Sequence, residues 1–307
     1  MTINNINSIA PPNLKKGDCI EIVACAKFIS VKDVADAISI IEDNGFVAKV
    51  NPQNFNKHNV FAGTIDQRIE ILQYALDDDE TKAIFFARGG YGTIQIIDGL
   101  DFDYFSKNPK WLVGFSDITI ILSHVKSYYN IQAIHGPMPF NFSATDTDSV
   151  INLFSLLQGN YKALECPLFK LNKLGSCKGK LFGGNLSILY SLIGTKDIDG
   201  IKNSILFLED VDEYLYHLER MIYTMDRSGI LKSLKGLVIG QMTAILDNKD
   251  SFGKTSYQLI YDIVKKYDYP VCFNFPIGHS SQNQPVITGK EVELNVTTAS
   301  SSITYLS

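Results

Sequence analysis

The chain has 307 residues and a formal net charge of −5 at pH 7, with 45% hydrophobic and 20% charged residues. This length suits two ordinary domains or one large one, and the composition is that of a soluble globular protein. The charge gives no basic footprint for a nucleic-acid partner, and no apolar run approaches the roughly 18 residues that a membrane span needs.

The N-terminal stretch Met1–Pro12 is polar and rich in asparagine, without the basic segment and apolar core of a signal peptide. We therefore expect a cytoplasmic protein that does not associate with membranes. The five cysteines are scattered, and none forms a Cys-x-x-Cys pair. They predict neither a zinc ribbon nor a disulfide framework, and we expect no metal and no cofactor.

Strands and helices alternate along the first half of the chain. Apolar runs predict strands at 19–24, 46–50, 83–87, 111–113 and 131–135. Apolar residues at helical spacing predict helices at 31–44, 66–76 and 118–129, with a short helix ending near 99. This alternation predicts an α/β fold of βαβ units with a mostly parallel sheet.

The pattern becomes less regular between about residues 141 and 174, and we place the domain boundary there. We expect an N-terminal domain at 1–145, a linker at 146–174 with a short helix at 150–157, and a C-terminal domain at 175–307. In the C-terminal domain, strands are predicted at 204–208, 237–240 and 271–275, and helices at 185–193, 212–225 and 257–266. Alternating residues at 291–296 and 303–306 predict a small antiparallel sheet that closes this domain.

Ser116 lies at the turn between the strand predicted at 111–113 and the helix that follows it. A serine on a tight strand-to-helix turn projects its hydroxyl out of the fold, and the helix N-terminus behind it favours developing negative charge. These features suggest a nucleophile. The alternative is a serine that only caps the helix, since the local sequence is not the Gly-x-Ser-x-Gly motif of α/β-hydrolases.

A glycine-rich turn, Arg88-Gly-Gly-Tyr-Gly92, follows the strand predicted at 83–87. Its glycines would let backbone N–H groups face a ligand, although the spacing fits neither a dinucleotide-binding loop nor a P-loop. Like Ser116, the turn lies at the carboxyl end of a predicted strand, which is where ligands bind in parallel sheets. The turn is therefore an oxyanion donor or a plain tight turn, close to Ser116 in either case.

Three further residues could take part in acid–base chemistry. Glu209 follows the strand predicted at 204–208, where the alternative is a solvated charge. His279 lies in a glycine-containing loop after the strand at 271–275, where the alternative is an incidental histidine. His135, at the end of the strand predicted at 131–135, is a rival base.

Six motifs, taken together, resemble those of the LD-carboxypeptidases, a serine peptidase family that includes murein tetrapeptide carboxypeptidase and the microcin-C immunity peptidases. The resemblance spans roughly residues 14–296. The motifs, in the order expected for the family, are Ala87-Arg-Gly-Gly-Tyr-Gly92, Val113-Gly-Phe-Ser-Asp-Ile-Thr119, His135-Gly-Pro-Met138, Phe182-Gly-Gly-Asn-Leu-Ser187, Leu206-Phe-Leu-Glu-Asp210 and Gly278-His279.

The resemblance implies a Ser-Glu-His triad and two backbone oxyanion donors. By their match to the motifs, these residues are Ser116, Glu209 and His279 for the triad, and Asp117 and Gly90 for the oxyanion, with Gly89 as the alternative to Gly90. The resemblance also implies an N-terminal Rossmann-like domain, a C-terminal mixed α/β domain and a homodimer. The site would then lie at the interface between the two domains.

The activity implied is that of a metal-free serine carboxypeptidase acting on murein tetrapeptides in cell-wall recycling. It would hydrolyse the amide between an L-configured centre of a diamino acid and a terminal D-Ala. One alternative is a microcin-C-like amidase that cleaves peptidyl nucleotides, but the only tryptophan, Trp111, lies in a predicted buried strand and is poorly placed to stack on a base. The other alternative is a non-catalytic α/β ligand-binding module. Arg88 and Arg220 are candidates, by residue type alone, to bind the terminal carboxylate.

One position departs from the family pattern beside the glycine-rich turn. The helix after the turn often carries Arg where this chain has Gln95. We expect this difference to affect substrate choice and to leave the triad unchanged.

Overall fold

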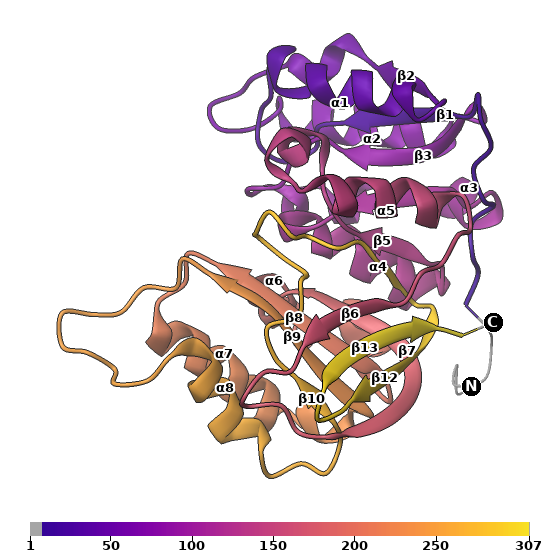
Figure 1. Cartoon of the computed structure of the whole chain (residues 1–307). Coiled ribbons are helices and arrows are strands. Elements are labelled where there is room, and N and C mark those ends of the chain that lie inside the picture. The colour runs from indigo at the N-terminus through magenta and orange to yellow at the C-terminus, as the bar shows by residue number, and fades with distance from the viewer. Residues whose placement is uncertain (1–7, 307) are drawn as a thin grey trace.

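Two β-sheets with their helices form the described part of the chain, residues 8–306 of a computed structural model (Figure 1). The N-terminal sheet has six strands in the order β11-β5-β4-β3-β1-β2, and the C-terminal sheet has seven in the order β10-β9-β8-β7-β12-β13-β6. The predicted α/β class, with a mostly parallel sheet followed by a mixed one, is confirmed. None of the described helices is long and apolar enough to span a membrane.

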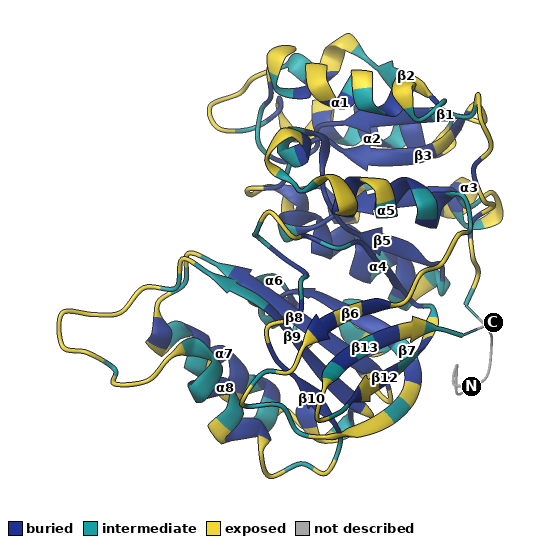
Figure 2. Ribbon diagram, viewed as in Figure 1, coloured by how far each residue is buried: buried dark blue, intermediate teal, exposed yellow. Residues whose placement is uncertain are grey.

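Five strands of the N-terminal sheet run parallel, and the sixth is antiparallel to its neighbour. The parallel strands are β1 Cys19–Val23, β2 Val47–Val50, β3 Thr81–Phe86, β4 Trp111–Gly114 and β5 Ala133–His135, and the antiparallel strand is β11 Val286–Thr288. The central strands are buried on both faces, as Figure 2 shows, because helices cover both sides.

The helices of this first half form two cores, one on each face of the N-terminal sheet. Helices α1 Lys32–Asp43 and α5 Thr147–Leu157 contribute to one core. Helices α2 Ile65–Asp77, α3 Asp103–Lys107 and α4 Thr119–Tyr129 contribute to the other. Between α2 and α3, two 3₁₀ turns, Thr93–Gln95 and Ile97–Gly99, replace the short helix that the sequence predicts.

The C-terminal sheet combines a parallel half with an antiparallel half. The parallel strands are β7 Gly175–Asn185, β8 Ile205–Val211, β9 Gly236–Thr243 and β10 Val271–Cys272, and the antiparallel strands are β12 Glu291–Val296, β13 Ser300–Tyr305 and β6 Leu164–Pro167. One core on this sheet contains the helices α6 Leu186–Ser191, α7 Leu215–Arg227 and α8 Ser256–Val264.

Two expectations for this half are wrong. Strands β12 and β13 do not form a separate closing sheet, because β12 pairs with β7 along its whole length. Strand β8 does not end before Glu209 but continues to Val211, because its pairing with β9 resumes after a register shift between Leu208 and Asp210. Glu209 therefore lies at an irregular point inside a buried strand.

The chain passes between the two sheets at more than one place. Within the predicted linker at 146–174, α5 packs into the core of the N-terminal sheet, and β6 joins β13 of the C-terminal sheet. From the predicted C-terminal domain, β11 pairs with β5 of the N-terminal sheet. These crossings hold the two sheets together next to the segment that carries His279.

Candidate active site

Ser116 begins a 3₁₀ turn, Ser116–Ile118, that leads directly from β4 into α4. Its φ angle is 61°, in the left-handed region that non-glycine residues rarely adopt. Such a conformation costs roughly 1–3 kcal/mol and persists only where the surrounding structure imposes it, which is common at active sites. The described residues give the Ser116 hydroxyl no hydrogen bond that would make it a helix cap.

Gly89 lies directly against this serine. A Cβ at Gly89 would lie 3.0 Å from the Ser116 Cβ, 3.1 Å from its Oγ and 3.3 Å from the backbone nitrogen of Asp117. Only glycine allows so close an approach, so the glycine-rich turn and the Asp117 N–H both lie beside the hydroxyl. At Gly90, where φ is +115°, a Cβ would instead meet the Lys27 side chain.

The side chain of Arg68, on α2, holds the glycine-rich turn in place through hydrogen bonds. It is only 1% exposed, and its Nη1 donates to the carbonyl oxygens of Cys25 at 3.1 Å and Gly92 at 2.9 Å. Its Nη2 donates to Gln95 Oε1 at 2.7 Å. We did not single out Arg68 from the sequence, although a charged residue three positions before the buried Ile71 on one helix face was a usable signal.

The turn is also tied to the serine loop itself. Asp117 Oδ2 accepts hydrogen bonds from the backbone N–H of Thr93 at 2.9 Å and from its hydroxyl at 2.6 Å. Burial raises the pKa of Asp117 above its usual value, with the Thr93 hydrogen bonds opposing that rise. The Asp117 side chain therefore holds the serine loop and the glycine-rich turn together.

Glu209 and His279 form a hydrogen-bonded pair, with His279 Nδ1 at 2.7 Å from Glu209 Oε2. Glu209 is completely buried, and His279 is partly exposed. Gly278, at φ +126°, makes this contact possible, because a Cβ there would lie 2.7 Å from the Glu209 Cβ. A side chain at position 278 would therefore clash with Glu209, and this steric requirement for glycine follows only from the fold.

Glu209 and His279 each stabilise the charged form of the other. Burial acts to raise the pKa of Glu209, but the charge and hydrogen bond of His279, together with His135 and Asn185, leave that pKa below its usual value. Burial likewise acts to lower the pKa of His279, but Glu209 outweighs it and raises the pKa above its usual value. An ionised carboxylate beside an imidazole that readily takes a proton is the arrangement of a triad acid and base.

Phe115 connects this pair to the serine loop. Its ring lies 4.7 Å from the His279 ring, measured between centroids, and the next residue in the chain is Ser116. The described residues contain no hydrogen bond between Ser116 Oγ and His279. In unliganded enzymes such bonds are often long and tighten when substrate binds. The structure thus joins Glu209 to His279 directly, and the residue before Ser116 contacts the His279 ring.

A second link between the two sheets runs through Asn185, at the end of β7. Its backbone N–H donates to Thr119 Oγ1 at 3.2 Å, and its Nδ2 donates to Asp210 Oδ1 at 2.9 Å. Thr119 is the first residue of α4, and Asp210 is the neighbour of Glu209. Burial, followed by the charge of Glu209, raises the pKa of Asp210 to about 7.

The other residues considered from the sequence lie in varied surroundings. His135 is completely buried between aromatic rings, and burial lowers its pKa to about 4. The Arg88 guanidinium stacks on Phe140 at 3.9 Å, and Arg220 lies over the Tyr216 ring on α7. Among residues 8–306, no group of three or more His, Cys, Asp or Glu side chains is placed to hold a metal ion.

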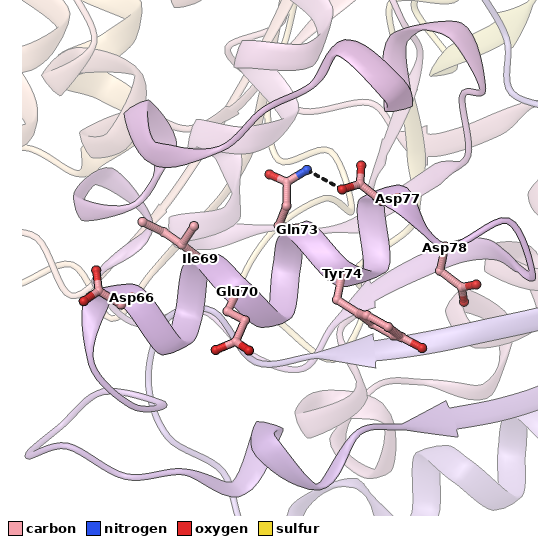
Figure 3. A pocket seen from close by; sticks show the side chains of 7 residues that line it. All are labelled: Asp66, Ile69, Glu70, Gln73, Tyr74, Asp77 and Asp78. Atoms are coloured by element: carbon pink, nitrogen blue, oxygen red, sulfur yellow. Dashed lines mark hydrogen bonds between the residues drawn. The ribbon is translucent and has the colours of Figure 1, made fainter.

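A pocket on the outer face of α2 is unrelated to these residues. Figure 3 shows that its lining is mostly acidic and comes from successive turns of that helix. None of the predicted site residues contributes to it. Its lining residues are Asp66, Ile69, Glu70, Gln73, Tyr74, Asp77 and Asp78.

Comparison with known protein families gives two matches that together cover most of the chain. The family model for the LD-carboxypeptidase N-terminal domain matches residues 20–136, and that for the C-terminal domain matches residues 178–294. A Bacillus subtilis protein named "Probable murein peptide carboxypeptidase" is 31% identical over 93% of this chain and 91% of its own. The "Murein tetrapeptide carboxypeptidase" of Pseudomonas aeruginosa is 28% identical over 90% of this chain and 92% of its own.

Solved structures share the fold over nearly the whole chain. The muramoyltetrapeptide carboxypeptidase from Oxalobacter formigenes superposes with a TM-score of 0.86 and 24% identity, covering 94% of this chain and 99% of that one. The structure of MccF in complex with glutamyl sulfamoyl guanosine superposes with a TM-score of 0.83 and 18% identity, covering 96% of this chain and 98% of that one. At these identities the superpositions establish the fold.

Proposed function

The chain belongs to the LD-carboxypeptidase family, and from this premise we propose that it is a metal-free serine peptidase that removes the terminal D-Ala of murein tetrapeptides. The observation that carries the proposal is the 2.7 Å hydrogen bond between Glu209 and His279, next to the left-handed Ser116. The scissile amide would join an L-configured centre of a diamino acid to D-Ala. We propose that the protein is cytoplasmic, that it acts in cell-wall recycling, and that it forms a homodimer.

In the first step, His279 Nε2 takes the proton of Ser116, and Oγ attacks the scissile carbonyl carbon. Glu209 Oε2 accepts a hydrogen bond from the Nδ1–H of His279, which fixes the imidazole tautomer and stabilises the imidazolium that forms. The backbone N–H groups of Asp117 and Gly90 donate to the oxyanion. Losing one such donor costs about 3 kcal/mol in a well-studied serine protease.

The second half of the reaction uses the same groups. The His279 imidazolium gives its proton to the amine of the departing D-Ala, and the substrate remains as an ester on Ser116 Oγ. Water then attacks this ester while His279 takes a proton from it, and the collapse of the tetrahedral intermediate returns that proton to Ser116. Each proton is accounted for by a side chain of this protein.

Two cations flank the glycine-rich turn and are suited to hold the free carboxylate of the substrate. Arg88 precedes Gly89, and the Lys27 side chain packs against Gly90. Neither makes an ion pair with another described residue. A planar guanidinium binds a carboxylate through two parallel hydrogen bonds. We therefore prefer Arg88 to Lys27 as the residue that binds the terminal carboxylate of the substrate.

The alternative substrate within the family is a peptidyl nucleotide. Trp111 is completely buried, and its Nε1 donates to the carbonyl of Pro12 at 3.0 Å, so this ring is not available for base stacking. Tyr91, on the glycine-rich turn, is 56% exposed and could stack on a base. We therefore place murein peptides first and keep the nucleotide substrate as the second candidate.

Mass spectrometry of the products tests the proposal. The protein is incubated with murein tetrapeptide, with and without EDTA, and the product is examined for loss of one alanine. We expect the wild-type protein to release one alanine both with and without EDTA, and Ser116→Ala to release none. Alanine loss that survives Ser116→Ala would reject the nucleophile, and sensitivity to EDTA would reject the metal-free mechanism. Cleavage of an aminoacyl sulfamoyl nucleotide in place of the tetrapeptide would favour the second candidate.

A further inference from the structure

His135 and Glu209 both carry buried polar atoms without a partner among the described residues. His135 is 0% exposed, and neither Nδ1 nor Nε2 of its ring has a hydrogen-bond partner. Glu209 is also 0% exposed, and its Oε2 is bonded to His279. Its Oε1 has no partner within hydrogen-bond geometry, since the Asn185 side chain, which helps to lower the pKa of Glu209, donates to Asp210 instead. Buried polar atoms are nearly always hydrogen-bonded in folded proteins, so unpaired atoms on two such residues require an explanation.

The packing places these two residues in one buried layer, although they come from different sheets. His135 is the last residue of β5, and its ring lies edge-on to Phe207 with centroids 5.0 Å apart. Phe207 and Glu209 are two positions apart in β8, so their side chains point to the same side of that strand. His135 therefore reaches the side of β8 from which Glu209 projects.

The ring of Phe115 provides a second contact that relates His135 to the Glu209–His279 pair. Its ring contacts both imidazoles, with centroid distances of 5.9 Å to His135 and 4.7 Å to His279. Phe115 is therefore a shared neighbour of His135 and of the histidine that is bonded to Glu209. His135 is fully buried, and it lies close enough to the pair for Glu209 and His279 to act on its pKa.

Burial keeps the His135 ring neutral near pH 7. It lowers the pKa of His135 to about 4, which the charge of Glu209 opposes and that of His279 reinforces. Among residues 8–306, no other charged or titratable group acts on the pKa of this ring. A neutral imidazole has one N–H donor and one acceptor nitrogen, so it can donate to a carboxylate without neutralising its charge.

We propose that His135 is a positioning residue that donates a ring N–H to Glu209 Oε1 through one bound water, since the two groups do not bond directly. This inference rests on the proposed function, because it extends the Ser116-His279-Glu209 triad by a fourth member. The hydrogen bond fixes the plane of the carboxylate, so that Oε2 stays aligned with His279. It also makes the geometry of the triad depend on how the N-terminal sheet, which carries His135, packs on the C-terminal sheet.

Two substitutions separate a hydrogen bond from simple packing. His135→Phe fills the ring volume without a donor, and His135→Gln keeps an N–H donor with similar reach. We expect His135→Phe to lower kcat for alanine release by about tenfold or more with little change in KM, as loss of an outer-shell partner does elsewhere. We expect His135→Gln to retain most of the activity. Thermal unfolding of each variant reports whether the fold is intact.

The titration of His279 supplies a readout that does not need turnover. With ¹⁵N-labelled histidine, the five histidines of the chain can be followed by NMR. In His135→Phe, the looser carboxylate should lower the pKa of His279, whereas His135→Gln should leave it close to the wild-type value. In the wild type, the His135 ring should be neutral, with an N–H protected from exchange, and Glu209→Gln should shift its nitrogen resonances.

The outcomes are distinct. If His135→Phe changes only the melting temperature, with kcat and the His279 pKa unchanged, His135 is a packing residue and the inference is wrong. The same conclusion follows if the wild-type His135 ring is insensitive to Glu209→Gln, a test that holds even if His135→Phe fails to fold. If the wild type releases no alanine, the proposed function fails, but the NMR titration still decides the link between His135 and Glu209.

Discussion

His279 Nδ1 and Glu209 Oε2 lie 2.7 Å apart, although 70 positions separate the two residues in the chain. The contact exists because Gly278 has no side chain to push the loop away from β8. It raises the pKa of His279 and lowers that of Glu209. The charges and the hydrogen bond of this pair therefore favour an ionised Glu209 beside a His279 that readily takes a proton, as the proposed chemistry requires.

The pair should control the pH dependence of activity. Because the pKa of His279 is raised, its free base, and with it kcat/KM, should increase as the pH rises through a value above the ordinary histidine pKa. Glu209→Gln removes the charge that stabilises the imidazolium, so the acid limb of the profile should move to lower pH. The equivalent change in a well-studied triad lowers kcat by about 10⁴-fold, and we expect a loss of that order. An unmoved acid limb in Glu209→Gln would contradict the pairing.

The pKa shifts of His279 and Glu209 should also make the free energy of unfolding depend on pH. The raised pKa of His279 contributes stability that is present below about pH 6.5 and lost as the pH rises through the folded pKa. The lowered pKa of Glu209 contributes stability present above about pH 4.5 and lost as the pH falls through the folded value. Urea unfolding of wild type and His279→Gln across this range should differ most where both groups are charged.

The backbone strain at Ser116 can be measured apart from its chemistry. Both Ser116→Ala and Ser116→Gly should abolish alanine release, since neither has a hydroxyl. Only glycine adopts a φ of 61° without strain, so Ser116→Gly should be more stable to unfolding than Ser116→Ala by about 1 kcal/mol. Equal stabilities by urea unfolding would show that the left-handed conformation carries no strain at this position.

Gly89→Ala should disable the site while leaving the rest of the fold intact. The added methyl would lie 3.1 Å from Ser116 Oγ and 3.0 Å from its Cβ, so the serine loop or the glycine-rich turn must move. A misplacement of about 1 Å can cost about 10²-fold in rate, so we expect the few tenths of an ångström required here to lower the rate by up to that factor. Gly99→Ala is a matched control, since its methyl would meet the flexible end of Ile69. Full activity in Gly89→Ala would show that the turn does not take part in catalysis.

Arg68→Met tests whether the buried arginine supports the glycine-rich turn. It removes the hydrogen bonds to Cys25, Gly92 and Gln95 while keeping much of the aliphatic stem. Leaving buried carbonyls unpaired costs about 1–3 kcal/mol each, so the melting temperature should fall. We also expect kcat to fall more than KM rises, because the turn acts on the transition state. A change in stability alone, with kcat retained at a temperature where the variant is folded, would limit Arg68 to a structural role.

Thr119→Val tests the link between the two sheets. The change keeps the shape of the side chain but removes the hydroxyl that accepts the Asn185 N–H. We expect a loss of stability of about 1–3 kcal/mol, from the unpaired buried N–H, and a lower kcat as α4 and β8 lose their common anchor. Ser127→Ala is a control on the same helix, since it removes a hydrogen bond to Asp197 that lies farther along α4 from Ser116. Equal effects of the two changes on kcat would argue against a specific role for Asn185.

The sequence by itself determined the features that depend on neighbouring residues. Alternating apolar runs and helical spacing predicted the parallel strands and most of the helices, because burial of one face imposes a local period. A serine between an apolar strand and a helix predicted the turn at Ser116. The partners of that serine came from the family motifs, since nothing in the local pattern links residues so far apart in the chain.

Only the tertiary structure decided the features that depend on packing between distant segments. It brought Glu209 to His279 through the bare backbone of Gly278, set Gly89 against Ser116, and placed Arg68 beneath the glycine-rich turn. It also added β11 to the N-terminal sheet and buried His135 against the rings of Phe115 and Phe207. A local pattern records which face of an element is apolar, but distances between side chains on different elements are fixed only when those faces pack against one another.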